Sequence, residues 1–351
     1  MAIDQEKLES FLHRVVGDLG AAVSAAMVLT GDRLGLYKAM RDAGPLTPKE
    51  LATRTHTAER YVREWLNNQA AGGYVAYDAE SGRFTLPEEQ ATALADETSP
   101  FFIAGGFQIT SAIWKARPQI EENFRTGHGL DWCDHDPALY EGTERFFKPL
   151  YVGNLVQNWI PALEGVDEKL RRGARVADVG CGHGASTLLM AQAYPNSEFT
   201  GFDYHHQSVE AARARAREAR LTDRVSFHVG ESTDFPGSDF DLVCHFDCLH
   251  DMGDPYGAAR HVREVIKKDG TWMIVEPYAE DGPELNHNPV GRVYYGASTF
   301  VCVPASLAHE GPALGAQAGF GKLKEVAQSA GFSRVRRAIT TPFNQIIEAR
   351  V

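Results

Sequence analysis

A glycine-rich loop between a predicted strand and a predicted helix has the composition of a nucleotide-binding turn. Gly180, Gly182 and Gly184 follow an apolar strand at 175–179. Because glycine has no Cβ, a ligand can pack directly against the backbone at these positions. The helix that follows begins with N–H groups that lack partners within the helix and can bind a polar ligand group. Asp178, just before the loop, is expected to hold either the loop or one end of the ligand.

Further polar residues follow the next two predicted strands and belong to the same predicted site. Asp203 ends the second strand, and its carboxylate can accept hydrogen bonds from both ribose hydroxyls. Tyr204 is placed beside it. Glu231 and Ser232 follow the third strand, where an acid and backbone amides can meet an adenine. The spacing of the glycine loop also fits dinucleotide-binding proteins, so a nicotinamide-dependent oxidoreductase remains an alternative.

The turn after the fourth predicted strand carries groups suited to proton transfer. It reads Asp247-Cys248-Leu249-His250-Asp251, and ligands of open α/β sheets bind beyond the carboxyl ends of the strands. Histidine titrates near neutral pH and can remove a proton from a hydroxyl. We expect His250 and Asp251 to be catalytic, with Asp251, Asp247 or Glu276 orienting the imidazole. Asp247 is also assigned to the cofactor site. Alternatively, His250 and Asp251 only shape the turn, and proximity suffices for a nucleophilic acceptor.

Strands and helices alternate from residue 174 onward, which predicts an α/β, Rossmann-like catalytic domain over 171–351. Strands are expected near 175–179, 198–202, 225–229, 241–246, 271–276, 334–340 and 344–350. Helices are expected near 185–193, 206–220, 256–267 and 320–330. This layout places the glycine loop and the His250 turn at the same edge of the sheet.

Residues 1–98 are predicted to form a mostly helical winged-helix domain. A helix over about 5–30 is followed by shorter helices and a hairpin at 74–86, and Thr47–Glu50 has the pattern of a capping box. The small residues of the first helix suit a close helix contact, either within the chain or between subunits. Acidic side chains outnumber basic ones in the first 90 residues, whereas a DNA reader needs a basic surface. Nucleic-acid binding is therefore not expected.

Two other segments are expected to cover an acceptor pocket. Residues 99–170 read as a helical, aromatic-rich linker, and residues 277–317 are too long for an ordinary connection, which favours a lid-like insertion. The alternatives are interdomain core and a structural extension. Residues 128–136 contain histidine, cysteine and aspartate, but their spacing matches no zinc or calcium motif, so no metal site is predicted.

Composition limits the class of protein. The chain has 351 residues, a net charge of −12 and five cysteines without a C-x-x-C pair, which favours free thiols in a reducing compartment. Residues 1–10 lack the basic start of a signal peptide, and the apolar stretch 19–30 is too short to span a bilayer. We therefore expect a cytoplasmic protein without a membrane partner.

Together these segments resemble the class I S-adenosylmethionine (AdoMet)-dependent methyltransferases, and in particular the winged-helix small-molecule methyltransferases of actinobacteria, which are similar to plant O-methyltransferases. The resemblance covers essentially the whole chain and rests on Arg33–Tyr37, Thr47–Ala52, Asp178–Gly184, Asp203, Cys248–Asp254 and Glu276-Pro277. It implies a closing strand pair at the C-terminus, AdoMet as cofactor and a homodimer built through the N-terminal domain. The cofactor-site residues it implies are Asp178, Gly180, Gly182, Gly184, Asp203 and Glu231.

In the plant enzymes the histidine of this His-Asp pair is the general base, which here is His250. Those enzymes carry a tryptophan after the pair, whereas Met252 and Gly253 follow here, which leaves the acceptor open. The function predicted is methyl transfer to a small aromatic or apolar acceptor, with oxygen as the expected target. The alternatives are an AdoMet-sensing winged-helix regulator, or an N- or C-methyltransferase that works by proximity without a base.

Overall fold

The computed structural model describes residues 3–351, and the first two residues of the predicted winged-helix domain lie outside this range. The described chain divides into two compact units. The first runs to Ala112 and includes Pro137–Pro149, and the second comprises Ile113–Asp136 and Leu150–Val351. The segment predicted as a linker, 99–170, therefore contributes to both units.

The first unit is a winged helix, as predicted. Its elements are α1 (Gln5–Arg33), α2 (Leu36–Met40), α3 (Pro48–Thr55), α4 (Glu59–Ala71), β1 (Ala76–Asp78), β2 (Arg83–Thr85) and α5 (Glu88–Leu94). The capping box of α3 is present, because the Thr47 side chain accepts from the Glu50 N–H and the Glu50 carboxylate accepts from the Thr47 N–H. Trp65 and Tyr37 lie in its core, with ring centroids 4.9 Å apart.

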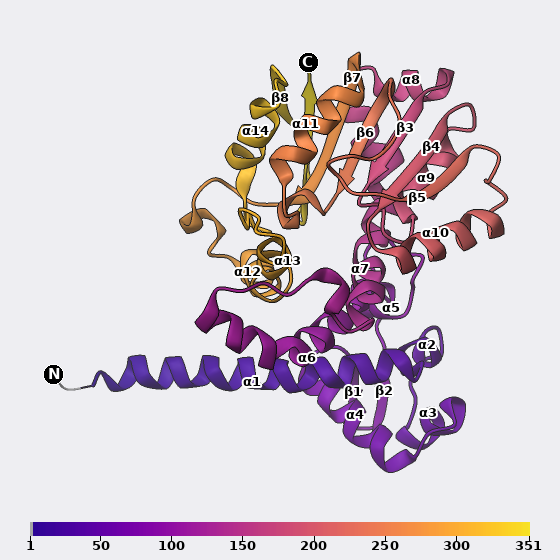
Figure 1. Cartoon of the computed structure of the whole chain (residues 1–351). Helices are drawn as coiled ribbons and strands as arrows, with labels where there is room; N and C mark the ends of the chain where they lie inside the picture. The colour runs from indigo at the N-terminus through magenta and orange to yellow at the C-terminus, as the bar shows by residue number, and fades with distance from the viewer. Residues whose placement is uncertain (1–2) are drawn as a thin grey trace. The chain divides into compact units, whose positions relative to one another are not determined.

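Helix α1 is the long indigo helix of Figure 1, and its N-terminal half projects beyond α2, α3 and α4. Large apolar side chains along it are exposed, at Phe11, Leu12, Val16, Leu19 and Val23. By length and composition alone, α1 is apolar enough to cross a membrane, although the stretch considered from the sequence, 19–30, is not. The core helix of a soluble protein and a signal sequence satisfy the same criteria.

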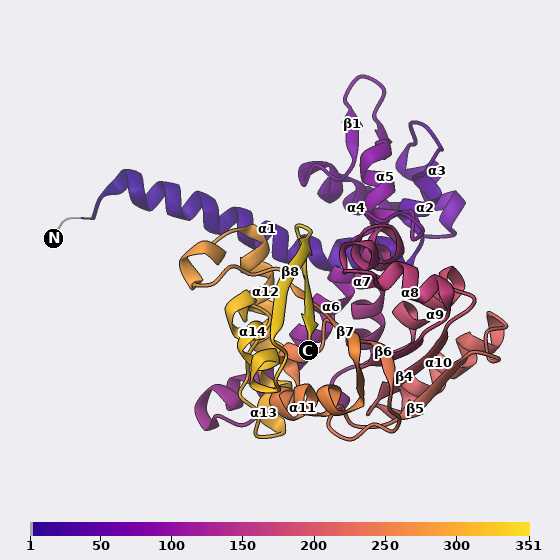
Figure 2. The same ribbon diagram turned by 90° about the horizontal axis from the view of Figure 1, so that it is seen from above.

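The second unit contains a seven-stranded sheet in the order β5-β4-β3-β6-β7-β9-β8, which confirms the predicted Rossmann-like fold. The strands are β3 (Arg175–Val179), β4 (Glu198–Asp203), β5 (Val225–Val229), β6 (Phe240–Phe246), β7 (Ile266–Pro277), β8 (Arg334–Thr340) and β9 (Asn344–Arg350). Strands β3 to β7 are parallel, and β9 pairs antiparallel with both β7 and β8. Figure 2 shows β5 and β8 at opposite edges of this sheet.

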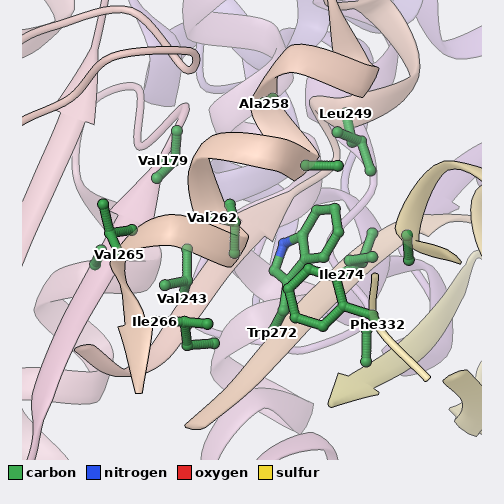
Figure 3. Packing of buried hydrophobic residues seen from close by; sticks show 14 of the residues in the cluster. Val179, Val243, Leu249, Ala258, Val262, Val265, Ile266, Trp272, Ile274 and Phe332 are labelled. Carbon is green, nitrogen blue, oxygen red and sulfur yellow. The ribbon is translucent and has the colours of Figure 1, made fainter. Parts of the chain in front are cut away.

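The sheet is covered by the helices predicted from the alternating pattern. These are α9 (Ala185–Ala193), α10 (His206–Glu218), α11 (Pro255–Val265) and α14 (Gly319–Ser329); α8 (Val166–Arg172), which was not among the predicted helices, precedes β3. In Figure 3, α11 places Ala258, Val262 and Val265 over the sheet, and the Trp272 ring lies against Phe332, 5.1 Å between centroids. This buried layer holds β6 and β7 rigid up to the turns that carry the candidate catalytic residues.

Two helical regions lie outside the sheet layers. Residues before the sheet form α6 (Ala104–Thr126), α7 (Ala138–Asn154) and a π-helical turn at Leu155–Trp159. The insertion between β7 and α14 contains α12 (Pro289–Phe300) and α13 (Cys302–Ala308). The start of α13 is anchored to the loop after α6, because Leu130 N–H donates to the Pro304 carbonyl at 3.0 Å.

Candidate active site

The glycine loop is held by a buried carboxylate. Asp178 is fully buried at the end of β3, and its Oδ2 accepts from the hydroxyls of Ser186, at 2.7 Å, and Thr187, at 2.6 Å. These hydroxyls belong to the first turn of α9, so the contact fixes the turn from strand to helix. Burial raises the pKa of Asp178 to about 6, against the lowering effect of the two hydroxyls. Its other oxygen, Oδ1, has no hydrogen-bond partner among the described residues.

Asp203 joins the loop to the next strand. Its Oδ2 accepts from the Gly182 N–H at 2.8 Å, and its Oδ1 accepts from the His205 N–H at 2.9 Å. Burial raises the pKa of this carboxyl as well. The Gly230 N–H donates to the Asp203 carbonyl at 3.1 Å, which brings the end of β5 alongside. The structure therefore gathers the predicted loop, Asp203 and the residues after β5 at one edge of the sheet.

Three predicted cofactor residues are more open. Tyr204 and Glu231 are exposed and Ser232 is half-buried. Tyr204 is only 37% exposed, and the burial of the rest of its side chain, followed by the charges of Asp131 and Cys133, raises its pKa well above the ordinary value. These residues follow β4 and β5, where the sequence analysis expects the ribose and the adenine of the cofactor. Their roles stay predictions.

The residues fit a cationic amino-acid nucleoside such as AdoMet. Gly180 and Gly182 have φ angles of +74° and +51°, and a Cβ at Gly180 would meet the Cys248 sulfur at 2.7 Å. A Cβ at Gly182 would meet nothing within 4 Å, so the backbone there faces open space. The unpartnered Asp178 Oδ1 can accept from an ammonium group. Carboxylates around the loop favour a ligand with positive charge.

The His250 turn is anchored from β7. Glu276 is 1% exposed, and its Oε1 accepts from the Leu249 N–H at 2.8 Å. Its Oε2 pairs with His250 Nδ1, and His250 Nε2 lies 3.2 Å from the sulfur of Cys302. Burial alone would lower the pKa of His250, but the Glu276 charge, followed by Cys302, raises it well above its usual range. Among the three acids considered from the sequence, Glu276 is the one that orients the imidazole.

Asp247 is enclosed by two neighbours that the sequence did not single out as site residues. Its Oδ2 accepts from the Tyr151 hydroxyl and its Oδ1 from the Asn344 amide, each at 2.7 Å. Burial, with a contribution from Glu276, raises the pKa of Asp247 to about 8. Asp251 follows on the same turn, and burial raises its pKa to about 7. The catalytic role of Asp251 stays a prediction.

Sequence patterns carried little signal for these partners. Tyr151 reads as one aromatic residue among many in the linker, and Asn344 begins an apparently ordinary strand. Cys302 stands out only as a thiol within the long insertion. One available signal was the polar pair Asn344-Gln345 at the start of a strand whose next two residues, Ile346 and Ile347, are apolar and buried.

The acidic loop at 128–136 has other contacts in the structure. Asp131 forms an ion pair with His309 at 2.5 Å, and the Tyr204 ring meets the His309 ring edge to face. Within residues 3–351, no group of three or more His, Cys, Asp or Glu side chains is arranged to hold a metal ion. The five cysteines are free thiols; Cys133 is exposed and Cys248 half-buried, so not all of them are core residues.

Comparison with known proteins places this geometry in a family. Residues 170–307 match the model of a methyltransferase domain, and residues 21–96 match an Rv2258c-like winged HTH domain. The chain is 30% identical over 214 residues to nocamycin O-methyltransferase of Saccharothrix syringae, covering 58% of this chain and 71% of that protein. The chain belongs to the AdoMet-dependent methyltransferases. This confirms the family and the cofactor predicted from the sequence.

Other methyltransferases align with the chain over different lengths. It is 30% identical over 151 residues to 27-O-demethylrifamycin SV methyltransferase of Amycolatopsis mediterranei, which covers 42% of this chain and about half, 49%, of that protein. The structure of mitomycin 7-O-methyltransferase superposes with a TM-score of 0.74 at 19% identity, covering 99% of this chain and 100% of that one. At that identity the superposition establishes the fold of this methyltransferase.

Proposed function

We propose that this methyltransferase transfers a methyl group from AdoMet to a hydroxyl of a small aromatic or apolar acceptor, with His250 as the general base. The observation that carries the proposal is the buried pairing of His250 Nδ1 with the Glu276 carboxylate, on the turn beside the glycine loop. Bound AdoMet supplies an electrophilic methyl group on a positively charged sulfur. A hydroxyl is a weak nucleophile until its proton leaves, and a carboxylate-oriented imidazole is suited to take that proton.

The fixed geometry of the turn supports this role. Because Glu276 engages Nδ1, the other ring nitrogen, Nε2, is the one that faces the insertion and its Cys302. The carboxylate also stabilises the imidazolium that forms when His250 takes a proton. Asp178, Asp203 and the three loop glycines are proposed to bind AdoMet, together with Tyr204, Glu231, Ser232 and Asp247.

The experiment is calorimetric titration with S-adenosylhomocysteine, with NAD(H) as the parallel control, followed by an acceptor screen. We expect binding of S-adenosylhomocysteine that is lost in Asp203→Ala, and no binding of NAD(H). Among phenols and alcohols that become methylated, His250→Ala should lower kcat at least 100-fold without changing the affinity for S-adenosylhomocysteine. Methylation of amines or carbon acceptors at an unchanged rate in His250→Ala would favour transfer by proximity instead.

The insertion at 277–317 is proposed to cover the acceptor. It brings the buried Tyr294 near Asp247 and Cys302. The pKa of Tyr294 is raised mainly by burial and further by the charges of these two residues. Replacing residues 289–300 with those of a related methyltransferase should change acceptor preference while sparing AdoMet affinity. An equal loss of both would count against a lid.

The N-terminal unit is proposed to form a homodimer through α1. Its exposed apolar side chains, including Leu12, Val16 and Val23, need a partner surface, and Gly17 and Gly20 leave room for a second helix at close range. Val16→Glu should convert the dimer to a monomer in light scattering, whereas Glu9→Gln should not. Binding of the wild type to lipid vesicles instead of self-association would contradict the proposal.

A cytoplasmic enzyme without nucleic-acid binding is proposed as well. The arginines of α4, the candidate recognition helix, pair with glutamates on the same helix: Arg60 with Glu64 and Arg63 with Glu59, each at 2.5 Å. This internal neutralisation leaves little positive charge for a phosphate backbone. Retention on a heparin column at physiological salt would argue for the regulator instead.

A further inference from the structure

Glu276, His250 and Cys302 form a hydrogen-bonded chain that runs from the core toward the surface. Their exposed fractions increase in that order, from 1% to 4% to 8%. Glu276 meets Nδ1 of His250, and the Cys302 sulfur lies 3.2 Å from Nε2. Both ring nitrogens are thus engaged, and the thiol is the most accessible member of the chain.

The position of Cys302 is set by several bonds rather than by one loose contact. Cys302 begins α13, and Ser306 of this helix donates its hydroxyl to the Met252 carbonyl at 2.8 Å. Further along the insertion, the Gly315 N–H donates to the His250 carbonyl at 3.1 Å. The insertion is therefore tied to the His250 turn at two points besides the thiol, which makes the sulfur-to-nitrogen contact a built feature of the site.

His250 can act as a base only as the neutral imidazole, the form that it takes above its raised pKa, and the chemistry of that form restricts what can reach the ring. When the ring proton is on Nδ1 and is donated to the Glu276 carboxylate, the ring has one in-plane lone pair, on Nε2, which lies 3.2 Å from the Cys302 sulfur and can accept the thiol proton. In this arrangement an acceptor hydroxyl cannot donate directly to Nε2. It can reach the base only through the sulfur.

We propose that Cys302 is a catalytic proton relay between the acceptor hydroxyl and His250, an inference that rests on the proposed O-methylation. The acceptor O–H proton passes to the sulfur of Cys302 as the thiol proton passes to Nε2. The acceptor oxygen forms its bond to the methyl carbon while the bond from that carbon to the AdoMet sulfur breaks. The products are the methyl ether, S-adenosylhomocysteine, a neutral thiol and an imidazolium paired with Glu276, which then loses the proton to solvent.

The groups that face this chain are compatible with such a transfer. Glu276 and Asp247 lie on the sheet side and Asp251 lies on the turn itself, whereas Tyr294 of α12 is close enough to Cys302 for the charges to interact and donates its hydroxyl to the Phe343 carbonyl at 2.7 Å. The Glu276 charge favours positive charge on the imidazole, so it assists movement of the thiol proton toward His250.

A first test needs no acceptor. The rate at which iodoacetamide alkylates Cys302 is measured against pH by peptide mass spectrometry, in the wild type and in His250→Gln. If His250 accepts the thiol proton, the wild-type profile should lie at least one pH unit lower, which is about tenfold faster alkylation near neutral pH. Exposed Cys133 is the internal control and should react alike in both proteins. Identical Cys302 profiles would overturn the relay.

A second test uses 7-hydroxycoumarin as a phenolic probe with AdoMet. We expect Cys302→Ala to lower kcat at least tenfold with KM for AdoMet unchanged, and Cys302→Ser to recover part of the rate with its pH optimum moved upward, because a hydroxyl gives up its proton less readily. If Cys302→Ala is as fast as the wild type while His250→Ala is inactive, the relay is wrong, and the role of His250 as the general base is supported. If His250→Ala keeps the full rate, the proposed function itself fails.

Discussion

Replacing Glu276 by glutamine removes one negative charge from the centre of the candidate active site and almost nothing else. The carboxylate is 1% exposed, accepts from the Leu249 N–H at 2.8 Å and pairs with His250 Nδ1. Glutamine keeps the shape and the acceptor for Leu249. The variant therefore isolates the effect of the charge on the imidazole.

The free energy that the Glu276–His250 pair loses in this variant follows from the difference between a charged and a neutral hydrogen bond. A bond to a charged partner contributes about 1.5–3 kcal/mol and one between neutral groups about 0.5–1.5 kcal/mol, so the pair loses about 1–2 kcal/mol. One pKa unit corresponds to about 1.4 kcal/mol, so the pKa of His250 should fall by about one unit. With the Glu276 charge gone, burial, which lowers the pKa of His250, is opposed mainly by Cys302, so the pKa should move from well above its usual range toward the ordinary value.

The same shift predicts how stability depends on pH. A histidine whose folded pKa is raised contributes stability that is fully present below its unfolded pKa, near 6.5, and that is lost as pH rises through the folded pKa. Glu276→Gln should therefore cost about 1–2 kcal/mol in urea unfolding at pH 6 and progressively less at higher pH. Glu218→Gln, on the exposed end of α10, is the matched control and should cost almost nothing.

The assay for the pKa itself is NMR titration of the His250 ring nitrogens in the wild type and in Glu276→Gln. An unchanged pKa, or a stability difference that grows with pH above 7, would refute the assignment of Glu276 as the group that charges the imidazole. Either result would also remove the observation on which the general-base role rests.

Three further predictions concern the cofactor side. Gly184→Ala should destabilise the protein by about 2 kcal/mol or more in urea unfolding, because φ is +79° and the new Cβ would lie 2.6 Å from the Phe227 ring; an unchanged midpoint would contradict this. Asp178→Asn should weaken S-adenosylhomocysteine binding at least tenfold by calorimetry, because the loop and an ammonium both need the charge; equal affinity would count against its role. If Asp247 lines the cofactor site, AdoMet must bind the protein in which the Asp247 carboxyl is ionised. Because the pKa of Asp247 is about 8, the affinity for AdoMet should rise from pH 6 to pH 8 and then level off. S-adenosylhomocysteine, which lacks the sulfonium charge, is the control and should change less.

The sequence by itself determined the fold class and predicted where the candidate site lies. Alternation of strands and helices after residue 174 predicted the sheet, and three glycines after a strand marked the nucleotide loop. Capping residues act within a few positions of one another, so the capping box Thr47–Glu50 predicted the helix that starts at Pro48. These signals are local, and local backbone preferences can be predicted from a sequence without knowledge of the fold.

Only the tertiary structure decided which of these polar groups contact one another. From the sequence, three acids were equal candidates to orient His250, and the structure selects Glu276, which lies 26 positions away on the neighbouring strand. Cys302 reaches the other ring nitrogen from a helix 52 positions away, and Tyr151 and Asn344 reach Asp247 from still more distant elements. Such contacts depend on strand order and on how an insertion folds back over the sheet. No periodic pattern records them, because packing between distant segments places no constraint on residue spacing along the chain.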